Sequence, residues 1–378
     1  MRQGTSACLR AALAALAALA LLVGTAGPST ADTIGGDRLA STHRTVDLLP
    51  GADPLPEIWA ETWIIADATT GHVLAQKGSH VRRAPASTLK MLTALTVLPV
   101  TSPQTTVVAT KKAAYTYGAR VGLRPGRSYS LDDLWYAVFL PSANDAAIAV
   151  AQANGGVRKT LREMNAVAAR LQANDTVART PNGLDRRGQL SSAYDLTLIA
   201  RAGLARADFA KYAGTARATF PDTKGKGRHP IYTTNRLLLK GYRGIIGVKT
   251  GFTSQAGRTY VGAARRGGTT LIVALMGIHE SSESAARKLL DWGFANRDAV
   301  SPVGVLVDPL PDAPASVPEP TSAALAPTTA PAPRTAAPAP SIAPDPAGPS
   351  QAVLWGAGAA AAAAGGLWIA AAVRRRRG

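Results

Sequence analysis

Cysteine is almost absent from this chain, because Cys8 is the only cysteine among its 378 residues. Cys8 precedes the apolar run at the N-terminus, where it is badly placed for lipoprotein acylation and would be removed with a leader. The rest of the chain then has no thiol, which excludes disulfides and cysteine-ligated metals. A domain of about 270 residues can bury enough apolar surface to fold without such cross-links.

Histidine is also scarce, and motifs for metal or phosphate binding are missing. The five histidines are scattered along the sequence, at His43, His72, His80, His229 and His279. The sequence has no HExxH zinc motif, no GxGxxG phosphate loop and no internal repeat. It therefore predicts neither a metal centre nor an organic cofactor.

The N-terminus has the composition of a secretory signal. Arg2 and Arg10 supply positive charge, and residues 11–23 form an apolar core that is too short to span a bilayer. Small residues precede a cleavage site after Ala31, with Ala26 as the alternative. Residues 1–31 are therefore predicted to be a signal peptide.

The C-terminus has the composition of a membrane anchor. Residues 353–373 carry no charge, and as a helix they would extend roughly 32 Å, close to the thickness of a hydrocarbon core. Four arginines at 374–377 mark the cytoplasmic side. Residues 351–378 are therefore predicted to be a transmembrane helix with a basic tail, with a detached apolar tail as the alternative. Residues 32–350 would lie outside the cell.

Proline-rich segments bound the part of the chain that is expected to fold. Fourteen of the 26 prolines lie between 302 and 349, so residues 301–350 are predicted to be an extended Pro/Ala-rich linker that holds the folded domain away from the membrane. Residues 32–56 are broken by three prolines and are interpreted as an N-terminal arm. The folded domain is expected at 57–300.

The chain carries an excess of positive charge. Its formal net charge is +18, and residues 32–300 hold 35 Lys and Arg against 20 Asp and Glu. Nucleic acid is not the expected partner, because the chain is exported and contains no zinc knuckle or interleaved basic and aromatic run. An anionic envelope polymer or a membrane surface is the favoured partner, and simple solubility is the alternative.

The order of predicted elements indicates an α+β fold. A hairpin is expected at 61–78, a helical block follows it, and strands return late in the domain. Helices are expected at 85–98, 131–152, 159–171, 194–205 and 284–294, and late strands at 245–251, 258–268 and 269–277. This order favours an antiparallel sheet built from both ends of the domain, flanked by helices, with a helical subdomain inserted between them.

The first chemical motif is Ser87-Thr88-Leu89-Lys90 at the start of the first predicted helix. Positions i and i+3 share one face of a helix, so the hydroxyl and the amine are expected to lie close together. A serine hydroxyl needs a neighbouring base to become a good nucleophile, and a lysine of lowered pKa can serve. A capping serine beside a surface lysine is the alternative.

Two further motifs follow. Ser142-Ala143-Asn144 interrupts an apolar stretch, where polar side chains need hydrogen-bond partners; a capped helix start is the alternative. Lys249-Thr250-Gly251 ends an apolar strand and offers a cation, a hydroxyl and an accessible backbone; an ordinary strand end is the alternative.

In this order, in an exported chain, the three motifs resemble the SxxK, SxN and KTG set of penicillin-binding proteins and serine β-lactamases. Residues 57–297 resemble the low-molecular-mass D-alanyl-D-alanine carboxypeptidases, serine peptidase family S11. The stretches LRPGRSYSLDDLWYAVFLPSANDAAIAVA, RTPNGLD and KTGFTSQAGRTYVGAARRGG carry the likeness beyond the motifs. The resemblance implies a β-lactamase/DD-peptidase-like fold and a peptidoglycan stem peptide ending in D-Ala-D-Ala as substrate, with β-lactams as inhibitors.

The resemblance also implies roles for the catalytic residues. Ser87 would attack the carbonyl between the two D-alanines, and neutral Lys90 would take its proton. Ser142, with Lys249 nearby, would pass a proton to the leaving D-alanine. Two lysines near one serine would lower each other's pKa, so that one is neutral while the other stays charged.

The same resemblance implies the substrate-binding residues. Asn144 would hold the substrate amide and orient Lys90. Thr250 and Lys249 would bind the terminal carboxylate, and Gly251 would let the substrate backbone come close. The N–H groups of Ser87 and Phe252 would form the oxyanion hole.

The sequence departs from the family pattern at two places. Phe252 stands where some relatives have histidine, but only its backbone has a role. Residues 280–284 read ESSES where some relatives carry a carboxylate-binding arginine, which leaves that contact in doubt. Arg236 resembles another basic position near the site and is a further binding candidate.

Three alternative functions stay open or are disfavoured on specific grounds. A class A β-lactamase needs a glutamate after SxN, but NDTVARTPNGLD has none and Glu163 comes early on a predicted helix. A DD-endopeptidase would use the same chemistry on a cross-link. A catalytically silent penicillin-binding or sensing module would keep the residues without turnover.

Overall fold

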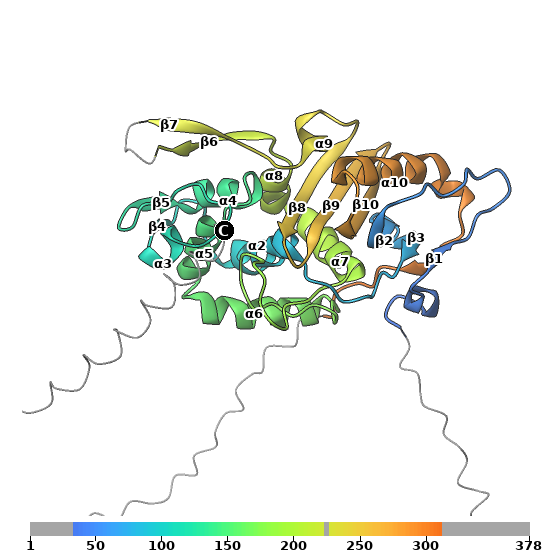
Figure 1. Ribbon diagram of the computed structural model, residues 1–378, viewed down its shortest axis with the longest axis horizontal. Coiled ribbons are helices and arrows are strands. Elements are labelled where there is room, and N and C mark those ends of the chain that lie inside the picture. Colours follow the sequence, from blue (N-terminus) through green and yellow to red (C-terminus); the bar gives the residue numbers. More distant parts are fainter. Residues whose placement is uncertain (1–32, 223–226, 312–378) are drawn as a thin grey trace, which may run out of the picture. The chain divides into compact units, whose positions relative to one another are not determined.

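The computed structural model describes residues 33–222 and 227–311 of the chain (Figure 1). The predicted signal peptide, most of the predicted linker and the predicted anchor lie outside these residues. Among the described residues, no helix has both the length and the apolar character needed to cross a bilayer. The described residues belong to one compact unit.

One antiparallel sheet forms the centre of this unit. Its strand order is β1-β3-β2-β10-β9-β8, and β11 pairs with β3. The strands are β1 (Arg44–Val46), β2 (Ala60–Asp67), β3 (His72–Lys77), β8 (Ile245–Thr253), β9 (Gly257–Arg266), β10 (Thr269–Ile278) and β11 (Gly304–Val305). The prediction of an antiparallel sheet built from both ends of the domain is therefore confirmed.

Both faces of the sheet are covered, which explains why the middle of each central strand is buried. All ten residues of β10 are buried. Ile272 and Ala274 belong to the core that includes helix α7 (Ala193–Leu204), whereas Leu271 and Val273 belong to the core that includes helix α10 (Ser282–Asn296). Alternate side chains of one strand thus point into two different cores.

A block of helices lies at one end of the sheet, beside β8 (Figure 1). Helix α2 (Lys90–Val97) lies at its centre, and all eight of its residues are buried. The other helices of the block are α3 (Lys111–Ala114), α4 (Leu131–Phe139), α5 (Asn144–Ala153), α6 (Val157–Arg170) and α8 (Ala207–Ala213). The inserted helical subdomain that the sequence predicts is therefore present.

Several short elements complete the fold. They are the hairpins β4 (Thr106–Val108) with β5 (Ser128–Ser130) and β6 (Arg217–Pro221) with β7 (Arg228–Tyr232), helix α9 (Arg236–Leu239), and the 3₁₀ turns η1 (Asp37–Ala40), η2 (Ala86–Leu89), η3 (Leu98–Val100) and η4 (Arg297–Ala299). None of these hairpins was expected from the sequence, because short exposed strands show little apolar alternation.

The structure corrects two predicted domain limits. The segment interpreted as an N-terminal arm, 32–56, contributes β1, which pairs with β3. The start of the predicted linker also belongs to the domain, since β11 pairs with β3 and Val303 and Leu306 are buried. A few well-placed apolar residues add these flanking segments to the sheet, although prolines surround them.

The helix predicted at 131–152 is two helices. Helix α4 ends at Phe139, and α5 begins at Asn144. Between them Ser142 has φ 63°, a left-handed conformation that a non-glycine residue rarely adopts. Pro141 lacks the N–H that a continuous helix would need. The break places the SxN motif at the start of α5.

Candidate active site

An open cleft of about 1220 Å³ lies between the sheet edge and the helical block. Seven of the predicted site residues line it: Ser87, Ser142, Asn144, Arg236, Thr250, Gly251 and Phe252. The remaining two, Lys90 and Lys249, are 0% and 1% exposed. The structure thus brings the three sequence motifs together around one space, with both lysines buried behind its surface.

Ser87 lies in the 3₁₀ turn η2, directly before α2. In a 3₁₀ turn, side chains at i and i+3 eclipse each other, which brings Ser87 Oγ to 2.8 Å from Lys90 Nζ. Ala86 has φ 49°, a strained conformation immediately before the serine. The Pro85 carbonyl accepts hydrogen bonds from Thr88 Oγ1 (2.6 Å) and Thr259 Oγ1 (3.0 Å), which fix this turn to the sheet.

Lys90 Nζ has three close oxygen neighbours. Besides Ser87 Oγ, they are Asn144 Oδ1 at 2.8 Å and the Asn182 carbonyl at 2.7 Å. A neutral amine has two N–H donors and one lone pair. It can therefore donate to the two amide oxygens and accept the proton of the serine hydroxyl.

The electrostatic surroundings favour this neutral amine. Burial lowers the pKa of Lys90 well below its ordinary value, the charge of Lys249 lowers it further, and Asp145 opposes the shift. Burial alone lowers the pKa of Lys249 to about 7. The two amines share a poorly solvated region. The state in which only one of them is charged is therefore more stable than the state in which both are charged.

The SxN residues come from the short connection between α4 and α5. Ser142 Oγ is buried and makes no hydrogen bond to any described residue. The Asn144 amide donates from Nδ2 to the Tyr117 carbonyl (2.8 Å), and its backbone N–H donates to the Ala119 carbonyl (2.7 Å). A Cβ on the intervening Gly118 would lie 2.7 Å from Asn144 Nδ2, so this approach requires a glycine.

The KTG residues lie on β8, an edge strand of the sheet, and among the described residues no strand pairs with the outer side of its backbone. Lys249 Nζ donates to the Thr250 carbonyl at 2.9 Å. A Cβ on Gly251 would lie 2.8 Å from the Ser87 backbone nitrogen. The Ser87 N–H therefore lies against the strand segment that carries the Phe252 N–H. Phe252 itself is 68% exposed.

Arg236 lies at the first position of α9, on the wall of the cleft, with a side chain that is 71% exposed. Its Nε is 3.5 Å from Glu283 Oε2, and Lys240 Nζ is 2.7 Å from the other oxygen of Glu283. Glu283 therefore offsets part of the positive charge that Arg236 brings to this end of the cleft.

Sequence reasoning missed two contributors to the site. The Asn182 carbonyl accepts a hydrogen bond from Lys90, and Thr234 Oγ1 is 2.6 Å from Thr250 Oγ1 on the cleft wall. The sequence indicates RTPNGLD only as a family-like segment, because the type of a residue does not reveal what its backbone carbonyl binds. It indicates TTNR only through its arginine.

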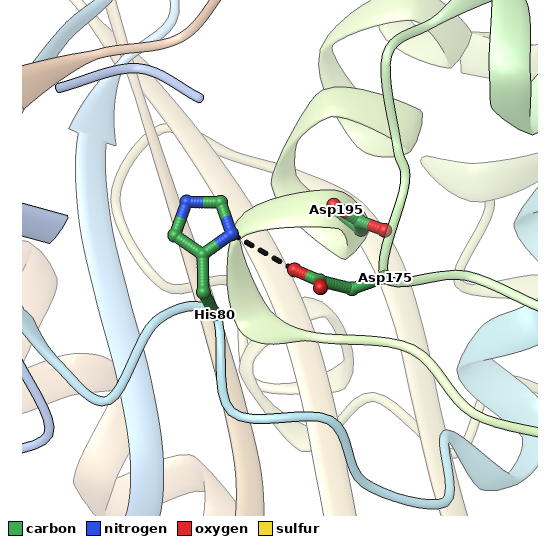
Figure 2. Close-up of side chains that lie close together, drawn as sticks. All are labelled: His80, Asp175 and Asp195. Carbon is green, nitrogen blue, oxygen red and sulfur yellow. Dashed lines mark hydrogen bonds and ion pairs between the residues drawn. The ribbon is translucent and has the colours of Figure 1, made fainter. Parts of the chain in front are cut away.

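One titratable cluster lies outside the cleft (Figure 2). His80 Nδ1 is 2.8 Å from Asp175 Oδ2, and His80 Nε2 is 3.1 Å from the Ile34 carbonyl. The Asp195 carboxyl lies beside them, accepts from Thr176 Oγ1, and has its pKa raised to about 7 by burial. Both ring nitrogens of His80 therefore have oxygen partners within the fold.

Comparison with protein families gives a match over residues 50–280 to a model described as D-alanyl-D-alanine carboxypeptidase, peptidase S11. The chain is 41% identical over 252 residues to D-alanyl-D-alanine carboxypeptidase DacB2 of Mycobacterium tuberculosis, covering 65% of this chain and 86% of the relative. It is 30% identical over 244 residues to DacF of Bacillus subtilis, of which it spans 62%.

Solved structures give the same picture. A crystal structure of a D-alanyl-D-alanine carboxypeptidase from Mycobacterium tuberculosis matches with a TM-score of 0.64 at 40% identity, covering 70% of this chain and 99% of the other. The Streptomyces K15 DD-transpeptidase matches with a TM-score of 0.61 at 29% identity, covering 64% of this chain and 100% of the other. Both matches agree with the predicted DD-peptidase-like fold.

Proposed function

The chain belongs to the D-alanyl-D-alanine carboxypeptidase family of serine peptidases, and we propose that it removes the terminal D-alanine of peptidoglycan stem peptides through an acyl-enzyme on Ser87. Serine-type D-Ala-D-Ala carboxypeptidase is the activity that the family match and the relatives support. The proposed residue roles are those that the family resemblance implies, and the geometry of the cleft supports them.

Acylation begins with attack of Ser87 Oγ on the carbonyl carbon between the two D-alanines. The hydroxyl proton moves to Lys90 Nζ, 2.8 Å away, as the new C–O bond forms. The carbonyl oxygen becomes an oxyanion, which accepts hydrogen bonds from the N–H groups of Ser87 and Phe252. Asn144 and the Asn182 carbonyl hold the amine in position.

The leaving group then needs a proton. Ser142 Oγ, buried without a partner among the described residues, donates to the departing nitrogen and regains a proton from the lysine pair. The C–N bond breaks and D-alanine leaves as a neutral amine. Water attacks the ester with the same base, releasing the shortened peptide and restoring Ser87.

Substrate orientation comes from the edge strand. An extended peptide fits along β8, whose outer backbone groups pair with no strand in the part of the chain that the structure describes. Thr250 Oγ1 and charged Lys249 bind the terminal carboxylate, and Arg236 adds positive charge further along the cleft. Gly251 keeps the strand close to Ser87. β-Lactams enter the same space and acylate the same hydroxyl.

The observation that carries this proposal is the Ser87–Lys90–Asn144 contact set around a buried amine of lowered pKa. The site also argues against rapid β-lactam hydrolysis. Glu163, the acidic residue considered for activating water, pairs with Lys159 Nζ at 2.6 Å on α6 and does not line the cleft. The acyl-enzyme formed with penicillin is therefore expected to persist.

We also propose that the domain works outside the cell, at the membrane. The relatives support an extracytoplasmic cell-wall enzyme. Export by residues 1–31 and anchoring by residues 351–378 depend on the sequence argument, since both segments lie outside the described residues. Expression of the chain with and without residues 351–378, followed by fractionation, tests the anchor; equal release of both forms into the medium would reject it.

The activity is tested with the full chain in detergent. It is expected to release D-alanine from a peptide ending in Lys-D-Ala-D-Ala and to form a covalent adduct with a fluorescent penicillin, located at Ser87 by mass spectrometry. Ser87→Ala is expected to abolish both, and Ser79→Ala, at another buried serine, to abolish neither.

Other outcomes select the other functions. Labelling without D-alanine release would favour a penicillin-sensing module. Cleavage of cross-linked muropeptides faster than of linear ones would favour a DD-endopeptidase. Transfer of the acyl group to an added amine faster than to water would favour a transpeptidase, the activity named for the Streptomyces structure.

A further inference from the structure

The segment 110–127, called the basic lobe below, differs in composition from its surroundings. Its eighteen residues, TKKAAYTYGARVGLRPGR, include five cations and no acidic residue. Four of these cations are exposed: Lys111, Lys112, Arg120 and Arg124. The segment therefore concentrates positive charge on the surface and contains no acidic residue of its own.

The basic lobe is held firmly against the helix that carries the SxN motif. The Asp145 carboxylate accepts hydrogen bonds from the backbone N–H groups of Val121, Gly122 and Leu123 at 2.9–3.2 Å. The two ends of the lobe meet, since the Gly126 N–H donates to the Ala109 carbonyl at 2.8 Å. Its surface is therefore a fixed part of the domain.

The lobe also borders the cleft. Tyr117, Gly118 and Ala119 line the cleft, and Tyr117 is 83% exposed. The exposed cations lie on either side of these three residues in sequence and do not themselves line the cleft. A chain bound to the lobe would consequently lie beside the place where substrate enters.

Within the described part of the chain, Lys111, Lys112, Arg120 and Arg124 form no ion pair, whereas some other exposed lysines do, such as Lys211 with Asp132 at 2.8 Å and Lys288 with Glu280 at 2.8 Å. Their density distinguishes the lobe, because all four lie within residues 111–124, which contain no acidic residue. Unpaired cations fixed at one site repel one another, which favours an anionic partner that spans them.

We propose that the basic lobe docks a phosphodiester-bearing polymer of the cell wall and thereby keeps the cleft close to stem peptides. This inference rests on the proposed function, which places the domain at the cell wall and gives it stem peptides as substrate. Arginine and lysine together suit repeated phosphates, which stay charged at every physiological pH. Exposed Tyr115 and Tyr117 add phenol groups that can bind polyol or sugar hydroxyls.

The position of the lobe favours this polymer over a lipid surface. A bilayer pressed on the lobe would cover the adjoining mouth of the cleft and exclude substrate. A flexible polymer chain covers a narrow strip, so the cleft stays open. The stem peptide itself occupies the cleft and does not account for cations outside it.

The test compares two variants of the full chain in phosphatidylcholine nanodiscs. The first is K111Q/K112Q/R120Q/R124Q. The matched control, R158Q/R162Q/R243Q/R287Q, removes four exposed cations that neither form ion pairs in the described part nor line the cleft. Binding of fluorescent poly(glycerol phosphate) is expected to weaken by about tenfold in the first variant and by less than about twofold in the control.

Activity on walls supplies the second readout. The unmodified protein is expected to release D-alanine faster from walls that retain their phosphodiester polymer than from walls stripped by hydrofluoric acid. The lobe variant is expected to show no such difference, while both hydrolyse a soluble peptide equally. Loss of soluble-peptide hydrolysis in every form would refute the proposed function instead, and the binding result would still stand.

Two results would overturn the inference. Equal weakening of polymer binding in the lobe variant and the control would show a general charge effect. Alternatively, phosphatidylglycerol nanodiscs that inhibit the unmodified protein on soluble peptide, but not the lobe variant, would show that the lobe binds lipid headgroups.

Discussion

The cations of the cleft and those of the basic lobe lie on the same domain, yet their surroundings are opposite. Lys90 and Lys249 are almost fully buried, and burial is the largest cause of their lowered pKa. Lys111 and Lys112 are exposed and carry no ion pair in the described part. The comparison shows that solvent access decides whether a lysine is a proton carrier or a fixed charge.

Replacing the buried base should have the largest effect on activity. Lys90→Met keeps the length of the side chain and removes the amine, so acylation by penicillin should slow by about 10³-fold or more. Lys112→Met, the same change at an exposed position, should leave the rate unchanged. Stopped-flow labelling with a fluorescent penicillin measures both. Comparable losses of acylation rate in the two variants would contradict the claim that only the buried lysine acts as a base.

The next largest effect is expected on the stability of the fold, because burying the charged amine of Lys249 costs free energy. The folded-state pKa of Lys249 is about 7, below its ordinary value of 10.5, so the unfolded chain binds more protons between these values. Stability therefore rises with pH across this window, and the full cost of the buried charge is present below about pH 7.

Lys249→Met should remove that cost. The variant is expected to unfold with a free energy higher by on the order of 3 kcal/mol at pH 6, with the gain shrinking towards pH 10. Denaturant unfolding at the two pH values measures it. A gain that is the same at both pH values would contradict the pKa of about 7.

The pH dependence of kcat/KM should reflect the titration of both lysines. The active form has Lys90 neutral and Lys249 charged, so kcat/KM should rise as Lys90 loses its proton and fall above about pH 7 as Lys249 does. Lys249→Arg, whose guanidinium keeps its charge, should remove the fall. A profile in which the fall persists in that variant would assign it to another group.

Neutralising the basic lobe should have the smallest effect on the chemistry itself. Hydrolysis of a soluble peptide by K111Q/K112Q/R120Q/R124Q should stay within about twofold of the unmodified rate, because exposed charges act weakly across water. Repeating the assay at high salt checks this. A tenfold loss would mean that the lobe shapes the cleft. It would contradict the distinction between the cations of the cleft and those of the lobe.

The sequence predicts the sheet and the three motifs well, because each depends on local pattern. β10 is apolar from Leu271 to Ile278, and Ser87 and Lys90 are three residues apart. The sequence does not predict the Asn182 carbonyl on Lys90 or the pairing of β1 with β3, because both depend on long-range packing. The left-handed Ser142 was not expected either, since its conformation is imposed by the surrounding helices.

The central claim is that a buried neutral amine removes the proton of Ser87, and the protonation of that amine can be measured directly. NMR of the chain labelled at lysine Cε, with Lys90→Met and Lys249→Met for assignment, follows the titration of each amine. We predict that the Lys90 signal is that of a neutral amine at pH 7, while Lys249 titrates at about pH 7. Titration of Lys90 near its ordinary value of 10.5 would contradict the account.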